Sequence, residues 1–269
     1  MKRKHLYSEN IQGCKIAWQE AGTGPALVLL HGIGGSSESW HSQIGQLKSN
    51  FRVVAWDMPG YGGSEKFKTS SPNVDHYVDS LFALLEFLGI RKVNLLGQSI
   101  AALIAARFCK SYPERVLSYV FAHGLTGLGE LDNVSRIVAK KARLEVFEAL
   151  GPQRFAREKG PAIMSPNVAD EVREKVVDIM ARVKPEGFRQ AVEMLSKANF
   201  FLDAPFIKVP SLVLCGDDDP ISPEPICRAV AEALPDAQIR LIAHAGHYSA
   251  MEQPETFNQM LDEFLSNIT

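Results

Sequence analysis

Residues 93–103 read VNLLGQSIAAL, and this stretch gives the first indication of the fold. The apolar run that ends at Leu96 predicts a buried strand, and the small residues after Ser99 predict a helix that packs closely on a sheet. Gly97 and Ser99 then occupy a sharp turn between strand and helix. Such a turn lifts a serine hydroxyl above the sheet and exposes it to a substrate. Ser99 could also serve only as the N-cap of the helix, so other segments have to separate the two interpretations.

Short apolar runs alternate with longer helical patterns along the rest of the chain. Strands are expected at residues 26–30, 52–56, 92–96, 117–122, 211–215 and 238–242, with antiparallel edge strands at 16–18 and near the N-terminus. Helices are expected at residues 74–88, 100–110, 222–234 and 255–265. Because strands that alternate with helices form βαβ units, the sequence predicts an α/β fold with a mainly parallel sheet flanked by helices.

Residues 125–204 interrupt this alternation. They contain helical patterns at 134–150 and 168–182 but no convincing strand, and glycine and proline punctuate them. We therefore expect residues 1–124 and 205–269 to form one core. Residues 125–204 are expected to form a helical cap that is inserted after the sixth strand.

The composition argues against several classes of protein. With 29 Lys and Arg against 31 Asp and Glu, the net charge of −2 gives no field that would attract a polyanion, and we expect no nucleic acid partner. No apolar stretch approaches the ~18–20 residues that span a bilayer, so we expect no membrane partner. The four scattered cysteines fit reduced thiols, which favours a cytoplasmic protein. A homo-oligomer is compatible with the sequence.

Four further segments follow predicted strands and are rich in glycine or in residues that can carry chemistry. They are HGIGGSS at 31–37, DMPGYGGS at 57–64, GDDDPISP at 216–223 and HAGHY at 244–248. Together with residues 93–103 they resemble the motifs of the α/β-hydrolase superfamily of serine hydrolases. Ala101 stands where the G-x-S-x-G elbow of that family has its second glycine, which is the one departure in this segment.

The resemblance implies a catalytic triad. Ser99 maps to the nucleophile, His247 to the base and Asp219 to the acid that orients the base. The spacing of the loop at 216–223 selects Asp219 over Asp217 and Asp218. The order Ser, Asp, His along the chain is also the order of the family.

The resemblance implies an oxyanion hole as well, formed by the backbone N–H groups of Ile33 and Ile100. Fixed main-chain donors suit this task because negative charge develops on the substrate oxygen during attack. We expect His31 and Asp57 to have structural roles and His244 to be a neighbour of the site. Neither a cofactor nor a metal ion is implied.

The insertion and the overall layout look similar to 3-oxoadipate enol-lactonases and small esterases. The expected activity is therefore cleavage of a small carboxylic ester or lactone, a small-molecule substrate, through an acyl-enzyme on Ser99. Four apolar or aromatic residues are candidates for the substrate pocket. They are Ile163, Met164, Phe200 and Tyr248.

Two alternatives stay open. A carbon–carbon bond hydrolase of a vinylogous diketone is weakened, because Gly35 replaces the proline of its H-G-x-G-P-G motif and Met251 lies near the place of its tryptophan. A ligand receptor of the same fold, with slow or no turnover, is the other alternative, because a fold does not determine a function. Turnover of p-nitrophenyl esters separates the receptor from the enzyme.

Overall fold

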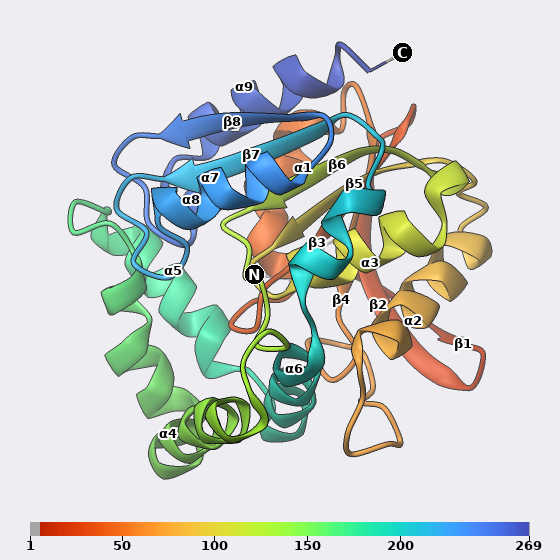
Figure 1. The fold of residues 1–269 in the computed structure, drawn as a ribbon. Coiled ribbons are helices and arrows are strands. Elements are labelled where there is room, and N and C mark those ends of the chain that lie inside the picture. The colour runs from red at the N-terminus through yellow and green to blue at the C-terminus, as the bar shows by residue number, and fades with distance from the viewer. Residues whose placement is uncertain (1–5, 269) are drawn as a thin grey trace.

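The computed structural model describes residues 6–268, and a single sheet runs through its centre (Figure 1). The strands are β1 (Leu6–Ile11), β2 (Cys14–Ala21), β3 (Ala26–Leu30), β4 (Arg52–Asp57), β5 (Val93–Gln98), β6 (Val116–Ala122), β7 (Ser211–Gly216) and β8 (Ala237–Ile242). Their order in the eight-stranded sheet is β1-β2-β4-β3-β5-β6-β7-β8. The pairs β1–β2 and β2–β4 are antiparallel and the other pairs are parallel, which confirms the predicted sheet and its antiparallel edge.

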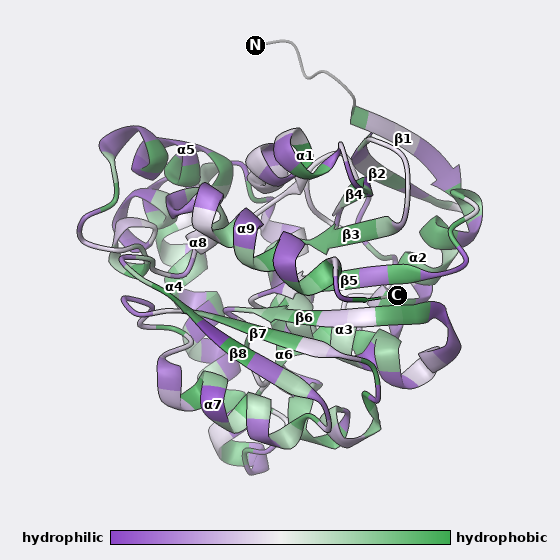
Figure 2. Ribbon diagram, turned by 90° about the horizontal axis from the view of Figure 1, so that it is seen from above, coloured by the Kyte–Doolittle hydropathy of each residue, from purple (hydrophilic) through white to green (hydrophobic). Residues whose placement is uncertain are grey.

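Helices cover both faces of this sheet. The α-helices are α1 (His41–Leu47), α2 (Val74–Phe87), α3 (Ala101–Ser111), α4 (Asn133–Lys159), α5 (Asp170–Ala181), α6 (Pro185–Lys197), α7 (Glu224–Ala233), α8 (Ser249–Glu252) and α9 (Pro254–Leu265). Short 3-10 helices lie at Ser37–Trp40, Pro113–Arg115, Pro161–Ile163, Phe200–Leu202 and Ala204–Phe206. Figure 2 shows α1 and α9 on one face of the sheet, and α3 and α7 on the other.

The alternation of side chains along each strand explains how both faces are packed. In β3, Leu27 and Leu29 belong to a core that includes Phe257 and Leu261 of α9. Val28 and Leu30 belong to the larger core that includes the buried faces of α2 and α3. Successive residues of a strand point to opposite faces, so a strand buried on both sides has to be apolar throughout. This is why the central strands were recognisable from sequence.

The helices α4, α5 and α6 lie between β6 and β7 in the chain. Figures 1 and 2 place α4 and α5 beyond the carboxyl ends of the parallel strands. Within α4 the backbone leaves helical geometry at Gly151, where φ is 66° and ψ is 164°, and Pro152 follows. Glycine tolerates this positive φ, so the chain turns there and α4 continues in a new direction. The helix α6 was not among the helices expected from sequence.

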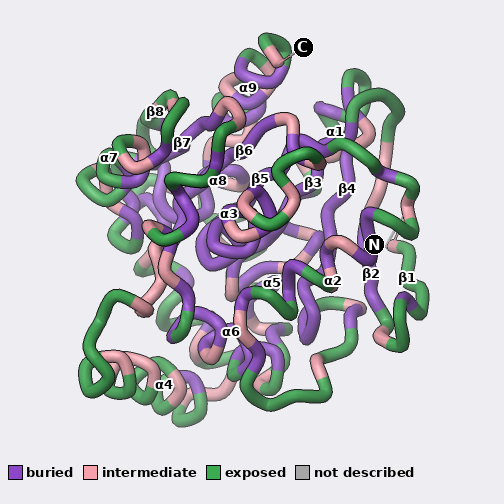
Figure 3. The backbone as a smooth tube through the Cα atoms, turned by 45° about the vertical axis from the view of Figure 1, so that its right-hand side comes forward, coloured by how far each residue is buried: buried purple, intermediate pink, exposed green. Residues whose placement is uncertain are grey.

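The helix α4 is the least buried of these elements. Only Phe147 and Ala156 of its side chains are buried, whereas the central strands β3 to β7 are buried almost throughout (Figure 3). Cys109, Cys215 and Cys227 are buried free thiols, and Cys14 is a half-buried one. Within residues 6–268, no helix combines the length and apolar character that crossing a membrane requires.

Candidate active site

Ser99 stands on the turn that joins β5 to α3. Its φ of 55° is positive, which is rare for a residue other than glycine and marks the strained turn expected of a nucleophile elbow. A Cβ atom at Gly97 would lie 2.5 Å from the backbone oxygen of Ala101, so only glycine lets α3 approach β5 this closely. Ala101 itself begins α3 and is fully buried, so a methyl group fits at the place of the second glycine.

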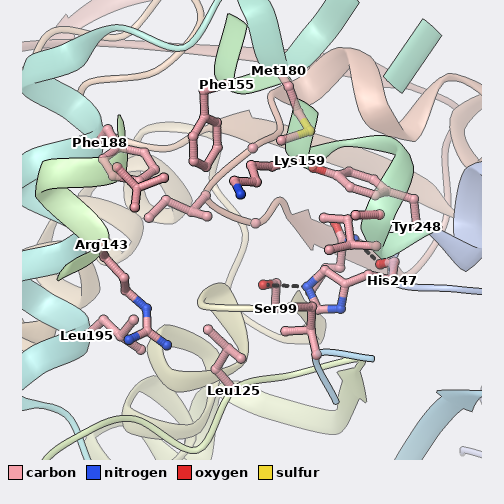
Figure 4. A pocket seen from close by; sticks show the side chains of 18 of the residues that line it. Ser99, Leu125, Arg143, Phe155, Lys159, Met180, Phe188, Leu195, His247 and Tyr248 are labelled. Atoms are coloured by element: carbon pink, nitrogen blue, oxygen red, sulfur yellow. Dashed lines mark hydrogen bonds between the residues drawn. The ribbon is translucent and has the colours of Figure 1, made fainter. Parts of the chain in front are cut away.

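The side chains of Ser99, His247 and Asp219 form one hydrogen-bonded chain. His247 Nε2 lies 2.9 Å from Ser99 Oγ, and His247 Nδ1 lies 2.9 Å from Asp219 Oδ2. The three residues come from segments that follow β5, β8 and β7, and all three are buried. Figure 4 shows Ser99 and His247 facing each other at one side of a cavity.

The carboxylate of Asp219 is surrounded by donors. Its Oδ1 atom accepts hydrogen bonds from the backbone N–H groups of Ile221 at 2.8 Å and Ser222 at 3.2 Å. Burial alone would raise the pKa of Asp219, but hydrogen bonds from His123 and His247 outweigh it and hold the pKa well below its usual range. Asp219 therefore stays ionised and can stabilise positive charge on the ring of His247.

The neighbouring acids of the same loop are engaged elsewhere. Asp217 is exposed, and its Oδ1 atom accepts from the backbone N–H of Ala245 at 3.3 Å. Asp218 accepts from the hydroxyl of Ser165 at 2.6 Å. Asp219 is thus the acid of this loop that meets His247.

A second histidine on Asp219 was missed by the sequence analysis. His123, fully buried, places Nδ1 at 3.1 Å from Asp219 Oδ2, the same oxygen that His247 contacts. Because an ionised carboxylate only accepts hydrogen bonds, Nδ1 of each ring carries the proton, and the Gly216 backbone N–H, 3.3 Å from His123 Nδ1, then has no lone pair to donate to there. The Nε2 atom of His123 is hydrogen-bonded to the hydroxyl of Ser249. Its place directly after β6, at the edge of the sheet where the other loops meet, is the signal that could have found it.

The proposed oxyanion donors flank Ser99. A Cβ atom on Gly32 would lie 2.8 Å from Ser99 Cβ, so the loop that carries Ile33 is in contact with the serine. Ile100 is the N-cap residue of α3. Within residues 6–268, neither the Ile33 nor the Ile100 backbone N–H donates to another protein atom, so both remain available to a substrate oxygen.

His31 and Asp57 hold the neighbouring loops together. His31 Nδ1 lies 2.8 Å from the Gly32 oxygen, and His31 Nε2 accepts from the Met58 backbone N–H at 3.0 Å, so the ring is neutral with its proton on Nδ1. Burial lowers the pKa of His31, which agrees with the neutral form. Asp57 accepts from the backbone N–H groups of Ser37 at 2.7 Å and Gly63 at 2.8 Å. The exposed His244 lies outside this network.

A cavity of about 500 Å³ opens beside Ser99 and His247. Of the four pocket candidates, Ile163 and Tyr248 line it, whereas Met164 and Phe200 do not. Phe200 instead packs edge-on against Phe121 of β6, with ring centroids 5.4 Å apart, and Met164 is buried in a small core. Both side chains are thus engaged in packing, Phe200 against the sheet and Met164 against helices α4 and α5 and Tyr248. The further lining residues include Leu125, Arg143, Phe155, Lys159, Met180 and Phe188 (Figure 4).

Comparisons with known proteins agree with this architecture. The family model described as alpha/beta hydrolase fold matches residues 25–254. The putative carbamate hydrolase RutD of Escherichia coli is 25% identical over 250 residues, covering 91% of this chain and 88% of RutD. A malate-bound esterase of Thermogutta terrifontis is 27% identical, with a TM-score of 0.88 over 98% of this chain and 99% of the esterase.

The enol-lactonase of Burkholderia xenovorans LB400 is 22% identical, which supports a common fold alone. Its TM-score is 0.84 over 97% of this chain and all of the lactonase chain. The family match spans most of the chain, from before the loop at His31 to beyond His247, and the observed strand order carries the same segments to one edge of the sheet. The chain belongs to the α/β-hydrolase fold family.

Proposed function

We propose that the protein is a serine hydrolase that cleaves a small carboxylic ester or lactone through an acyl-enzyme on Ser99. The observation that carries this proposal is the unbroken hydrogen-bonded chain from Ser99 Oγ through the ring of His247 to Asp219, at the wall of a cavity. A hydrogen-bonded base makes a serine hydroxyl nucleophilic, and a fixed carboxylate holds that base in the required tautomer.

The first half of the reaction makes the acyl-enzyme. Ser99 Oγ attacks the substrate carbonyl while His247 Nε2 takes the hydroxyl proton, and Asp219 stabilises the resulting imidazolium. The backbone N–H groups of Ile33 and Ile100 bind the oxyanion of the tetrahedral intermediate. When this intermediate collapses, the C–O bond to the leaving group breaks, and His247 returns the proton to the departing alkoxide.

The second half releases the acid. Water attacks the acyl carbonyl as His247 takes one of its protons, and collapse of the second intermediate returns that proton to Ser99 Oγ. With an ester substrate the alcohol leaves after the first half. With a lactone both ends stay in one molecule, and a hydroxy acid leaves at the end.

The names of the relatives support the same reaction class. RutD is named a putative carbamate hydrolase, and the Thermogutta protein is named an esterase. Hydrolysis of either substrate type proceeds through attack on a carbonyl carbon and needs an oxyanion hole. The choice of an ester or lactone for this chain therefore agrees with the chemistry of those names.

Covalent labelling tests the nucleophile. A fluorophosphonate probe should label the wild-type protein and should leave Ser99→Ala unlabelled. Ser111→Ala is the matched control, because Ser111 is exposed at the far end of α3, the helix that Ser99 precedes. Labelling of Ser99→Ala at the wild-type rate would show that another residue is the nucleophile.

Steady-state turnover tests the reaction itself. Hydrolysis of p-nitrophenyl acetate and butyrate, and of lactones of graded ring size, is the expected result. Acceptance of vinylogous diketones alone would replace this proposal with carbon–carbon bond cleavage. A single burst of p-nitrophenol without further turnover would instead indicate a receptor that retains the triad.

A further inference from the structure

Two positive charges line a cavity that is otherwise mostly apolar. Its wall is formed by aliphatic and aromatic side chains such as Leu125, Phe155 and Phe188, together with the catalytic loops. Arg143 and Lys159 also line it, and among the described residues of the wall there is no Asp or Glu. The cavity therefore carries net positive charge at neutral pH.

Neither cation is neutralised by the protein. Within residues 6–268, Arg143 and Lys159 form no ion pair, and the one hydrogen bond of Arg143 is to the Ala139 oxygen of its own helix, at 3.4 Å. Two other cations of α4, by contrast, have an acidic partner. Lys140 lies 2.9 Å from Glu193, and Arg154 lies 2.5 Å from Glu158. The two cations that face the cavity are thus available to an anion from outside the protein.

The shape of α4 brings both charges to one cavity. Arg143 precedes the break at Gly151 and Lys159 ends the segment after it, so a straight helix would carry them apart. Figure 4 shows both side chains directed into the cavity, away from the side on which Ser99 and His247 meet. In this view the apolar side chain of Leu125 lies between Arg143 and Ser99, and Lys159 enters the cavity beside Phe155.

Arg143 is exposed through the open cavity, yet neighbouring protein atoms remove part of its hydration. This desolvation lowers the pKa of the Arg143 guanidinium, which nevertheless stays charged at neutral pH. A partly desolvated guanidinium gains more from an anion than one in bulk water does, because the interaction is less screened. A carboxylate matches the planar pair of N–H donors of arginine, and the ammonium of Lys159 adds a second positive charge that attracts an anion into the cavity.

We propose that Arg143 and Lys159 bind a carboxylate of the substrate. The preferred substrates are then esters or lactones in which a free carboxylate is separated from the reactive carbonyl by an apolar segment. The carboxylate binds at α4, the apolar segment lies against Leu125 and Phe155, and the carbonyl reaches Ser99. This inference rests on the hydrolase function proposed above and specifies the substrate class of the same site.

Matched pairs of esters test the proposal. Each pair consists of the mono-p-nitrophenyl ester of a dicarboxylic acid and its neutral analogue, in which the free carboxyl is methylated. The chain length is graded from pair to pair, and spontaneous hydrolysis is subtracted. We expect kcat/KM for the acid to exceed that for the methyl ester by about tenfold or more at the best length, the factor expected of one hydrogen bond between charged groups.

Substitutions then locate the preference. Arg143→Gln and Lys159→Gln should each lower the ratio of the two kcat/KM values several-fold, and the double variant should bring it close to one. Arg154→Gln is the matched control on the same helix, because Arg154 is exposed and does not line the cavity. It should keep the wild-type ratio. Added salt should lower the ratio in the wild-type protein because it screens the attraction.

The outcomes separate the two proposals. A wild-type ratio near one at every chain length, with turnover of the neutral esters intact, overturns the carboxylate site and leaves the hydrolase function standing. A high ratio that survives the double variant overturns the assignment to Arg143 and Lys159. Loss of turnover for both esters together with absence of Ser99 labelling overturns the hydrolase function, and the carboxylate site with it.

Discussion

Replacing Asp219 by asparagine tests the hydrogen-bonded chain at its most constrained point. The carboxylate accepts four hydrogen bonds in the structure, two on Oδ1 from backbone N–H groups and two on Oδ2 from imidazoles. An amide keeps one accepting oxygen and replaces the other with a donor. In Asp219→Asn, two of the four donors therefore lose their acceptor whichever way the amide points.

The structure indicates which two are lost. Backbone N–H groups cannot change their chemistry, but an imidazole can move its proton to the other nitrogen. The amide oxygen will therefore face Ile221 and Ser222, and the amide N–H₂ group will face the Nδ1 atoms of His123 and His247. His247 then carries its proton on Nε2, the atom that must receive the proton of the serine hydroxyl. A wrong tautomer of this kind lowers kcat by about 10⁴ in the serine-protease triad, about 5.5 kcal/mol in the barrier.

We expect kcat/KM of Asp219→Asn for p-nitrophenyl acetate to fall by a comparable factor of about 10⁴. The initial rate of p-nitrophenol release by the purified variants measures this loss, and a cooperative thermal unfolding transition confirms that the variant is folded. Asp217→Asn is the matched control in the same loop. Its exposed side chain does not touch His247, so activity should stay near that of the wild type. Activity of Asp219→Asn within tenfold of the wild-type value would refute the role assigned to the acid.

Three further predictions concern the packing and charge around this site. His123→Phe should lower the free energy of unfolding by about 1–3 kcal/mol, because the hydroxyl of Ser249 loses a buried hydrogen-bond partner. It should lower kcat far less than Asp219→Asn does, and an equal loss of kcat would mean that His123 is itself required for the chemistry. Gly97→Ala should destabilise the fold, since its Cβ would lie 2.5 Å from a backbone oxygen of α3. Gly45→Ala is the control: its Cβ would have no atom within 4 Å, and an alanine within helix α1 should stabilise the fold by about 0.5–1 kcal/mol. Denaturant unfolding that ranks the two variants the other way would contradict this packing. The pKa of Asp219 is lower in the folded than in the unfolded chain, so its contribution to stability is present above the unfolded pKa of about 3.9 and is lost as the pH falls toward the folded pKa. Between pH 5 and pH 3 the free energy of unfolding should therefore fall more for the wild type than for Asp219→Asn, and an equal fall in both proteins would refute the shift.

The sheet and the triad were predictable for a common physical reason. Strands buried on both faces have to be apolar, so runs such as residues 93–96 and 211–215 stand out in the sequence. Parallel strands send the loops at their carboxyl ends to one edge of the sheet, which makes loops far apart in the chain neighbours in space. A Ser, an Asp and a His that each follow such a strand can therefore be placed together before the structure is known. Their detailed geometry could not be predicted in this way.

His123 shows where this reasoning stops. It also follows a buried strand, β6, and it also reaches the carboxyl edge of the sheet. Its contact with Asp219 depends on the backbone at residue 123, where φ is 49°, a positive value that the sequence does not predict for histidine. Without that local conformation nothing in the sequence distinguishes it from a structural histidine. The contact of His123 with Asp219 is thus a consequence of tertiary structure.

The side chains of residues 125–204 that line the cavity were harder to predict. Some residues of this segment pack against other protein atoms, and others face the open cavity. Apolar periodicity identifies side chains that pack, and Phe200 and Met164 do pack, but against the protein and away from the cavity. A side chain that lines an open cavity is exposed to solvent and resembles a surface residue in the sequence, as Arg143 and Lys159 do. Both residues also lack an ion pair within residues 6–268, which leaves their charges available to an anion. Substrate preference in such a hydrolase therefore depends on which polar side chains of residues 125–204 face the cavity. For Lys159, this orientation depends on the change of direction of α4 at Gly151.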